Sequence, residues 1–314
     1  FETTSQTITI RVERDPSYPN ITNPDGLCYD ETTLEFIVDD TPEINPVVIA
    51  PHCDGDDGND DRDGFDQFDT STLTADLLGP NQSLDDYEIS FLYTDEDGNL
   101  LSAPELRNPF NTKTQTVVVT LTNKLNTTCP ATYNIDFVVN PLPEFTVDDA
   151  TIVCLNLPPI PIGVVSADGD YSYTWTHTDL NGNNTPFPST EDIIFIGVGG
   201  TYYVTATTTD GTNCSRTLSI EVEESEIATL TLDDITVEDL TSDNNNTITI
   251  DTANLGIGDY EFAIDDPNGP YQNEPLFENV RPGIHTIYIR DKNDCGIAQI
   301  DVSVIGYKKF FTPN

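Results

Sequence analysis

Six cysteines carry the most specific chemistry in this chain, and their spacing repeats. They are Cys28, Cys53, Cys129, Cys154, Cys214 and Cys295. Cys28 and Cys129 lie 101 positions apart, and Cys53 and Cys154 are separated by the same interval. Equal offsets indicate a duplicated unit. The absence of a CxxC pair and the small number of histidines disfavour zinc ligation, so disulfides are predicted, with free buried thiols as the alternative.

One early and one late cysteine in each unit predict the bridges Cys53–Cys129 and Cys154–Cys214. Each bridge would close a long loop and remove about 4 kcal/mol of unfolded-chain entropy. Such bonds persist only in an oxidising compartment, which here means the periplasm or the outside of the cell. Cys28 is expected to pair with a residue upstream of this sequence. Cys295 has no early partner in its own unit and is a candidate free thiol.

The acidic run that follows Cys53 is the second segment with site-like chemistry. Seven aspartates occur between Asp54 and Asp66, and only Arg62 offsets them. Crowded carboxylates repel one another unless a hard cation holds them, and Ca²⁺ takes about six to eight oxygens from flexible loops. The run from Asn59 to Gly64 matches the first half of a calcium loop, but Thr70 stands where its bidentate glutamate is expected. We predict a Ca²⁺ site, with a metal-free acidic loop as the alternative; the predicted ligands are Asp57, Asn59, Asp61, Asp63, Asp66 and Asp69.

No catalytic motif accompanies these residues in the sequence. There is no GxSxG, no HExxH and no phosphate-binding glycine loop. Pairs of carboxylates are numerous enough for a glycosidase dyad, but small repeated sandwich units offer no deep cleft for one. We therefore predict that the protein is not an enzyme.

The charge of the chain restricts its partners. It contains 55 acidic and 12 basic residues, a formal net charge of −43. Nucleic acids and anionic membrane surfaces attract cationic proteins, so neither is an expected partner. No apolar run reaches membrane-spanning length, and direct membrane insertion is not expected. The chain contains no methionine, and we expect residue 1 to lie within a longer precursor.

Short alternating strands must position the cysteines. The sequence has 22 prolines and 19 glycines, and no segment keeps a helical period for three turns. One strand precedes each late cysteine and another follows it, and this pattern occurs four times. The preceding strands are predicted at 6–12, 115–121, 200–206 and 285–290, and the following ones at 34–38, 133–139, 218–222 and 297–304.

This repeat divides the chain into modules. Residues 1–44 contain the closing hairpin of a module, and residues 307–314 form a linker; between them lie module 1 (45–143), module 2 (144–225) and module 3 (226–306). Each whole module has the size of a seven-stranded immunoglobulin-like sandwich. The predicted fold class is therefore all-β, with tandem immunoglobulin-like β-sandwich modules in an elongated array. Trp175 is expected in a module core, with carbohydrate stacking as the alternative.

The C-terminal residues resemble a known sorting signal. Ile305-Gly-Tyr-Lys-Lys-Phe-Phe-Thr-Pro-Asn314 is similar to the opening of the gliding motility-associated C-terminal domain, the type B signal of the type 9 secretion system. The acidic loop at 53–68 and the segments 260–265, 271–283 and 290–295 resemble repeats of large cell-surface gliding adhesins. Module 3 departs from those repeats because it lacks the early cysteine. The signal-like residues are Phe310, Phe311, Thr312, Pro313 and Asn314.

This resemblance implies an extracellular, outer-membrane-attached stalk of a cell-surface adhesin that serves adhesion and gliding motility. The implied partners are the type 9 secretion translocon and outer-membrane attachment proteins. Surface polysaccharide or the substratum would be bound through upstream regions. Two alternatives remain open: an accessory β-sandwich tail of a secreted hydrolase, and an array of carbohydrate-binding modules.

Overall fold

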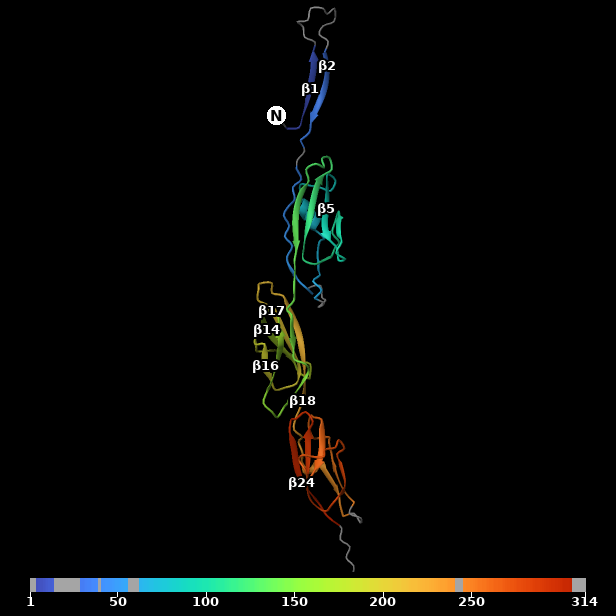
Figure 1. Cartoon of the computed structure of the whole chain (residues 1–314), viewed down its shortest axis with the longest axis vertical. Helices are drawn as coiled ribbons and strands as arrows, with labels where there is room; N and C mark the ends of the chain where they lie inside the picture. The colour runs from blue at the N-terminus through green and yellow to red at the C-terminus, as the bar shows by residue number, and fades with distance from the viewer. Residues whose placement is uncertain (1–3, 14–28, 39–40, 56–61, 241–244, 307–314) are drawn as a thin grey trace, which may run out of the picture. The chain divides into compact units, whose positions relative to one another are not determined.

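The computed structural model describes residues 4–13, 29–38, 41–55, 62–240 and 245–306 (Figure 1). Almost all regular structure in these ranges is β-strand, and the exceptions are the short helix α1 (Leu73–Leu78) and the 3₁₀ turn η1 (Leu232–Asp234). The predicted all-β class is confirmed. Within the described ranges no helix has the length and apolarity needed to cross a membrane. The chain forms two compact units, Phe1–Pro141 and Leu142–Asn314, and each is described by itself.

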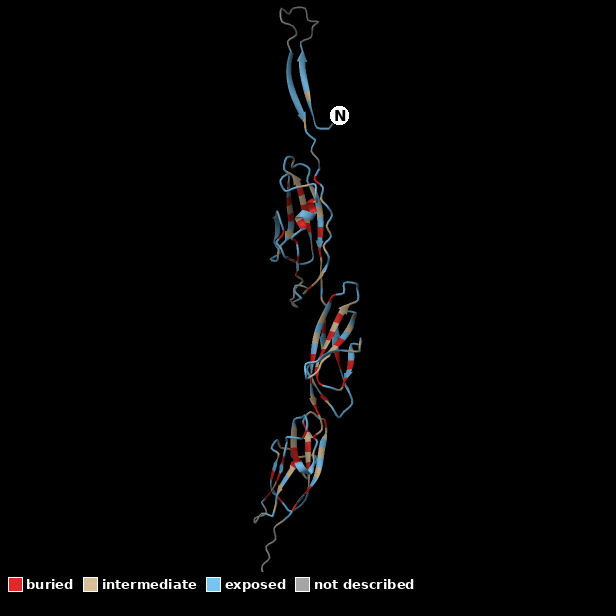
Figure 2. Ribbon diagram, turned by 180° about the vertical axis from the view of Figure 1, so that it is seen from behind, coloured by how far each residue is buried: buried red, intermediate tan, exposed pale blue. Residues whose placement is uncertain are grey.

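The first unit begins with a hairpin of strands β1 (Gln6–Glu13) and β2 (Tyr29–Phe36). The two strands pair antiparallel over their whole length, from Gln6 opposite Phe36 to Glu13 opposite Tyr29. No other strand in the described ranges is hydrogen-bonded to this hairpin. The hairpin is consequently exposed over almost its whole length (Figure 2). Its apolar side chains on one face, such as Val12 and Leu34, are exposed as well.

Module 1 is built on a four-stranded antiparallel sheet in the order β6-β5-β8-β9. Its strands are β5 (Tyr87–Thr94), β6 (Leu100–Ala103), β8 (Gln115–Asn123) and β9 (Ala131–Phe137). Two short pairs complete the module: β4 (Asp66–Phe68) with β7 (Phe110–Thr112), and β3 (His52–Cys53) with β10 (Val139–Asn140). Helix α1 adds Leu73, Leu77 and Leu78 to a core in which Phe68 and Phe110 meet Phe137 edge to face.

Module 2 is a two-sheet sandwich. One sheet has the order β11-β13-β16 and the other β12-β18-β17-β14-β15. The strands are β11 (Phe145–Val147), β12 (Thr151–Cys154), β13 (Ile160–Ala167), β14 (Tyr171–Thr178), β15 (Asn184–Phe187), β16 (Ile193–Ile196), β17 (Gly200–Thr208) and β18 (Ser215–Ser225). Trp175 on β14 is 2% exposed, and its Nε1 donates a hydrogen bond to the carbonyl of Glu191 at 2.9 Å. Its predicted place in the core is confirmed, and a buried ring offers no platform for a sugar.

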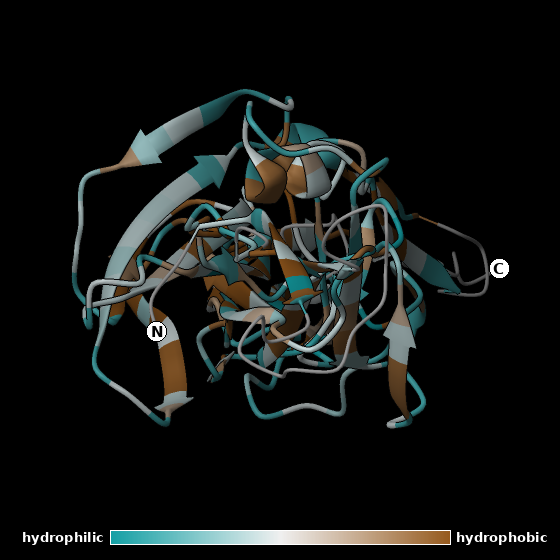
Figure 3. Ribbon diagram, turned by 90° about the horizontal axis from the view of Figure 1, so that it is seen from above, coloured by the Kyte–Doolittle hydropathy of each residue, from teal (hydrophilic) through white to brown (hydrophobic). Residues whose placement is uncertain are grey.

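Module 3 repeats the two-sheet plan with three strands in each sheet, β19-β20-β22 and β21-β23-β24. The strands are β19 (Ile235–Glu238), β20 (Asn246–Ile250), β21 (Tyr260–Ile264), β22 (Leu276–Val280), β23 (Gly283–Asp291) and β24 (Ile297–Val304). Hydrophobic and hydrophilic residues follow one another along several of the strands seen in Figure 3, as a strand with one buried face requires. Both sheets contribute to one buried cluster, with Ile248 and Ile287 fully enclosed. The modules therefore have the all-β immunoglobulin-like fold.

Candidate functional site: the junction between modules 2 and 3

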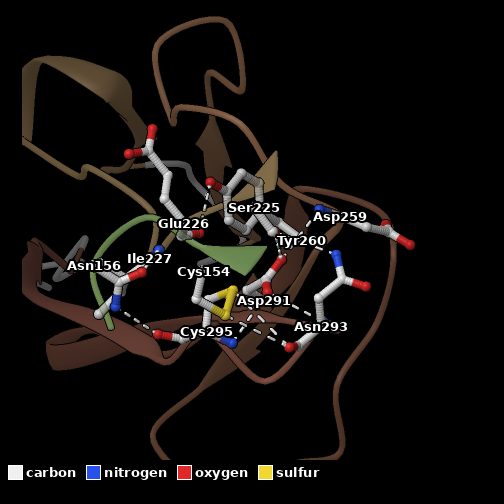
Figure 4. The surroundings of a disulfide bond; sticks show 10 residues. All are labelled: Cys154, Asn156, Ser225, Glu226, Ile227, Asp259, Tyr260, Asp291, Asn293 and Cys295. Carbon is white, nitrogen blue, oxygen red and sulfur yellow. Dashed lines mark hydrogen bonds between the residues drawn. A yellow bond between two sulfur atoms is a disulfide. The ribbon is translucent and has the colours of Figure 1, made fainter. Parts of the chain in front are cut away.

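A disulfide joins module 2 to module 3 inside the second unit. Cys154 is the last residue of β12, and Cys295 lies in the turn between β23 and β24 (Figure 4). Their Cα atoms are 5.3 Å apart, although the two residues are 141 positions apart in the sequence. The bond is therefore a clamp between neighbouring modules and does not cross-link one sandwich internally.

The predicted pairing of Cys154 with Cys214 is wrong, and the strand geometry explains why. β12 runs parallel to β18, which places Cys154 beside Ser225 at the C-terminal end of β18. Cys214 precedes Ser215 at the other end of this 11-residue strand. At about 3.3 Å per residue the two cysteines are roughly 35 Å apart, whereas a disulfide requires Cα atoms within about 7 Å.

The predicted pairing of Cys53 with Cys129 is wrong for the same reason. Cys53 lies opposite Asn140 of β10, beyond the C-terminal end of β9. Cys129 precedes the start of β9, whose 7 residues alone span about 23 Å. Cys129 is an exposed free thiol, whereas Cys53 and Cys214 are each disulfide-bonded. Cys295, the candidate free thiol, is bonded.

Asp291 organises the module 3 side of the junction. It ends β23, is 0% exposed, and its carboxylate accepts hydrogen bonds from two directions (Figure 4). From module 2, the hydroxyl of Ser225 donates to Oδ1 at 2.9 Å. From module 3, the donors are the backbone N–H groups of Asp259 (3.2 Å), Asn293 (3.1 Å) and Cys295 (3.2 Å). A buried carboxylate with four donors is fully satisfied, so Asp291 fixes the cysteine turn and holds module 2 against it.

Asn156 bridges the junction from the module 2 side. Its Nδ2 donates to the carbonyl of Cys295 at 2.8 Å, and its Oδ1 accepts from the N–H of Ile227 at 3.1 Å. One side-chain amide therefore contacts both the clamped turn and the chain that enters module 3. An amide can serve both contacts because it carries a donor and an acceptor.

The segment that links the two modules is hydrogen-bonded along its length. The N–H of Leu155 donates to the carbonyl of Ser225, and the N–H of Glu226 donates to the carbonyl of Ile257 at 2.8 Å. The hydroxyl of Tyr260 donates to the carbonyl of Glu226 at 3.1 Å. Burial, assisted by the nearby charges of Glu226 and Asp291, raises the pKa of Tyr260 to about 12, so the hydroxyl keeps its proton at neutral pH. The linker is fixed, not a loose tether.

The predicted metal ligands are not brought together in the described part of the chain. Asp57, Asn59 and Asp61 lie outside the described residues. Asp63 accepts a hydrogen bond from the N–H of Phe65 in a local turn, and Asp66 is buried with its Oδ2 2.6 Å from Nδ1 of His52. Asp69 is exposed, and the N–H of Ser71, followed by the Ser71 hydroxyl, holds its pKa below the usual value. Among the residues that the structure describes, no group of three or more His, Cys, Asp or Glu could hold a metal ion.

The sequence did not single out the polar residues of the junction. None of these residues belongs to a motif, and each is of a type that is common in turns and strands: Asp291, Asn156 and Ser225. One signal was present in the sequence. The segment 290–295, which contains Asp291 and Cys295, resembles adhesin repeats. The predicted sorting-signal residues, from Phe310 to Asn314, lie outside the described residues.

One family model matches part of the chain. Residues 51–143, most of module 1, match the family described as the Flavobacterium inter-domain disulphide bond domain. A comparison with curated proteins found no match.

Solved structures with similar arrangements of strands include immunoglobulin domains and bacterial adhesins. Immunoglobulin domains 1–5 of Sidekick-1 are 10% identical with a TM-score of 0.27; the match covers 72% of this chain and 53% of that chain, about half its length. A 1.5-MDa bacterial ice-binding adhesin is 12% identical with a TM-score of 0.27, covering 73% and 89% of the two chains. A Ca²⁺-stabilized ice-binding adhesin of an Antarctic bacterium is 10% identical with a TM-score of 0.28, covering 72% and 66%. Likenesses this weak say nothing about function.

Proposed function

We propose that this chain is a non-enzymatic stalk segment of a cell-surface adhesin and acts outside the cell. The observation that supports this most directly is the clamp between Cys154 and Cys295 with its buried hydrogen-bond network. A disulfide of this kind persists in an oxidising compartment. A junction fixed by a covalent bond, a buried carboxylate and a hydrogen-bonded linker serves a spacer, which must hold its direction.

The match of module 1 supports the same reading. The family matched by residues 51–143 is described by its inter-domain disulphide bond, and a bond of that kind is present between modules 2 and 3. The covalent cross-link between modules 2 and 3 is thus proposed as a property of the stalk.

Three further properties are proposed because residues 305–314 resemble the type B sorting signal: export by the type 9 system, attachment to the outer membrane and a role in gliding.

Antibody against module 1 should label intact cells of the source bacterium. The labelling should disappear from a strain without the type 9 translocon, while the protein accumulates inside. Labelling that needs permeabilised cells in both strains would contradict the surface location. Normal gliding after deletion of the gene would remove the motility role alone.

Calcium binding by the acidic loop of module 1 is proposed as a second property. Asp66 is 1% exposed, and its Oδ1 has no hydrogen-bond partner. A buried carboxylate oxygen without a donor is unfavourable, and a bound cation would relieve it. Among the described members of the predicted ligand set, Asp66 is the one that supports this proposal.

Calorimetric titration of the full chain with Ca²⁺ tests this. We expect saturable heat that is lost in Asp66→Asn and retained in Glu96→Gln, an exposed acid in another turn of module 1. The absence of saturable heat in the unsubstituted protein would leave the metal-free acidic loop.

Carbohydrate binding would need a different site from Trp175, such as the 270 Å³ hollow lined by Tyr93, Asp95 and Arg107.

A further inference from the structure

The clamp provides a second covalent route across the junction. β12 and β18 are parallel neighbours, and Cys154 is the register partner of Ser225. The backbone leaves module 2 through Ser225, and the disulfide leaves it through Cys154, one strand spacing away. Two covalent connections therefore depart from the same end of the same sheet.

The two routes differ greatly in length. Along the backbone, Cys154 and Cys295 are 141 positions apart, a distance that includes most of module 2 and most of module 3. Through the disulfide, their Cα atoms are 5.3 Å apart. When a chain with two parallel covalent routes is stretched, the shorter route becomes taut first and carries the tension.

We propose that, for tension applied between the start of module 2 and the end of module 3, the Cys154–Cys295 disulfide carries the load and residues 155–294 lie off the load path. Tension that enters at the start of module 2 and leaves at the end of module 3 then passes only through β11, β12, the disulfide and β24. The inference deepens the proposed stalk function, which supplies the reason for tension. The load path itself follows from the covalent connectivity.

The strands on this path are anchored in the module cores. β11 carries Phe145 and β12 carries Val153, which are 4% and 0% exposed. β24 carries Val302 and Val304, which are 4% and 3% exposed, and pairs with β23 over eight residues. Even if these strands were pulled out of their sheets, the length released on each side of the disulfide would be about ten residues.

The disulfide is shielded from reductants on its Cys295 side, whereas Cys154 is partly exposed. Cys295 is 2% exposed, and the Asp291 network and the Asn156 amide enclose its turn (Figure 4). Because thiol–disulfide exchange requires a thiolate to reach a sulfur atom, burial slows it. Attack on the Cys295 sulfur is therefore slow while the junction stays intact.

Single-molecule stretching of the full 314-residue chain tests the proposal. Handles are attached through bio-orthogonal side chains at the exposed positions Glu144 and Ile305, which lie just outside the loop closed by the disulfide. We expect the oxidised protein to reach its limit without unfolding residues 155–294. The double variant Cys154→Ser/Cys295→Ser should extend about 500 Å further, because 141 positions at about 3.5 Å each are released. Cys129→Ser, which removes the exposed free thiol, should behave like the unsubstituted protein.

A second measurement covers the case in which the double variant folds poorly. The unsubstituted protein is held at constant force until its load-path strands have yielded, and a reductant is then added. Cleavage of the disulfide should produce a delayed gain of the same length, about 500 Å. Equal extension of the oxidised protein and the double variant, or no gain on reduction, would overturn the proposal. Cell-surface labelling decides the stalk function separately, so the two failures are distinguishable.

Discussion

At the scale of single residues, the carboxylate of Asp291 holds the junction between modules 2 and 3 together. Its carboxylate accepts one hydroxyl and three backbone N–H groups, and all of these donors lie at the clamped turn or the junction. The residue is 0% exposed, so water cannot replace it without opening the junction. The same carboxylate therefore serves both the local turn and the contact between modules.

We expect Asp291→Ala to destabilise the turn around Cys295 by about 3 kcal/mol, because several buried donors lose their acceptor. Hydrogen exchange of the Asn293 and Cys295 amides measures this locally, which suits a chain of several modules. Asp301→Ala is the control. Asp301 is exposed on β24 and accepts only the hydroxyl of Thr286, so its removal should leave those amides unchanged. Equal protection in both variants would contradict the role of Asp291.

His285 makes module 3 sensitive to pH. Its Nδ1 lies 2.8 Å from Oδ2 of Asp265, and its Nε2 lies 2.7 Å from the carbonyl of Arg281. Both neighbours are acceptors, so only the protonated ring can donate to both. Burial opposes the charge, but the hydrogen bond to Asp265, the bond to Arg281 and the charge of Asp265 outweigh it and raise the pKa of His285.

A raised pKa in the folded state stabilises module 3 below the unfolded value of 6.5, and this contribution is lost as pH rises through the folded pKa. We expect the melting temperature of the His285→Gln variant to differ less from that of the unsubstituted protein at pH 9 than at pH 6. An NMR titration of the imidazole should give a midpoint above 6.5. A midpoint at or below that value, or a melting difference independent of pH, would contradict this account.

At the scale of elements, the β1–β2 hairpin and the β8–β9 hairpin match position by position. Gln6 lies opposite Phe36 just as Gln115 lies opposite Phe137, so the two registers coincide. In β8–β9 the inward residues are enclosed, with Val119 0% exposed. Its counterpart Ile10 is 43% exposed, because no strand or second sheet in the described ranges covers β1–β2.

This match gives a pair of equivalent substitutions with opposite outcomes. Val119→Asp places an unpaired carboxylate in the core of module 1 and should lower the free energy of unfolding of that module by more than about 4 kcal/mol. Ile10→Asp at the equivalent position should change the free energy of unfolding by no more than about 0.5 kcal/mol. Hydrogen exchange along β8 reports the change, with β17 of module 2 as the internal reference. Loss of protection in β8 with Ile10→Asp would show that the hairpin contributes to module 1.

The sequence predicted the strands far better than the disulfides. Alternation located β24 at the same residues as the structure and β8 to within two residues, because each has one buried face. Trp175 was also placed correctly, because a core tryptophan on a middle strand is the familiar arrangement in sandwiches of this kind. The cysteine partners could not be found in this way, since Cys154 lies at the C-terminal end of β18 only through the parallel pairing of β12 with β18. That pairing joins residues about 70 positions apart, and no local pattern records it.

At the scale of the whole molecule, a net charge of −43 acts on every module. Like charges destabilise a folded chain through mutual repulsion, and salt screens them over a Debye length of about 30 Å at 0.01 M and 10 Å at 0.1 M. We expect the melting temperature to rise by several degrees between these concentrations of NaCl. Choline chloride should have the same effect, because screening does not depend on the identity of the cation. A flat response would show that the carboxylates are too dispersed to matter.

The placement of Cys154 and Cys214 at opposite ends of β18 also governs the order of events during biosynthesis. Once module 2 has folded, its two cysteines cannot reach each other, so the finished strand itself prevents the wrong bond. Cys154 must stay reduced until module 3 has been synthesised and has formed its β23–β24 turn. Formation of the Cys154–Cys295 bond therefore follows the folding of module 3.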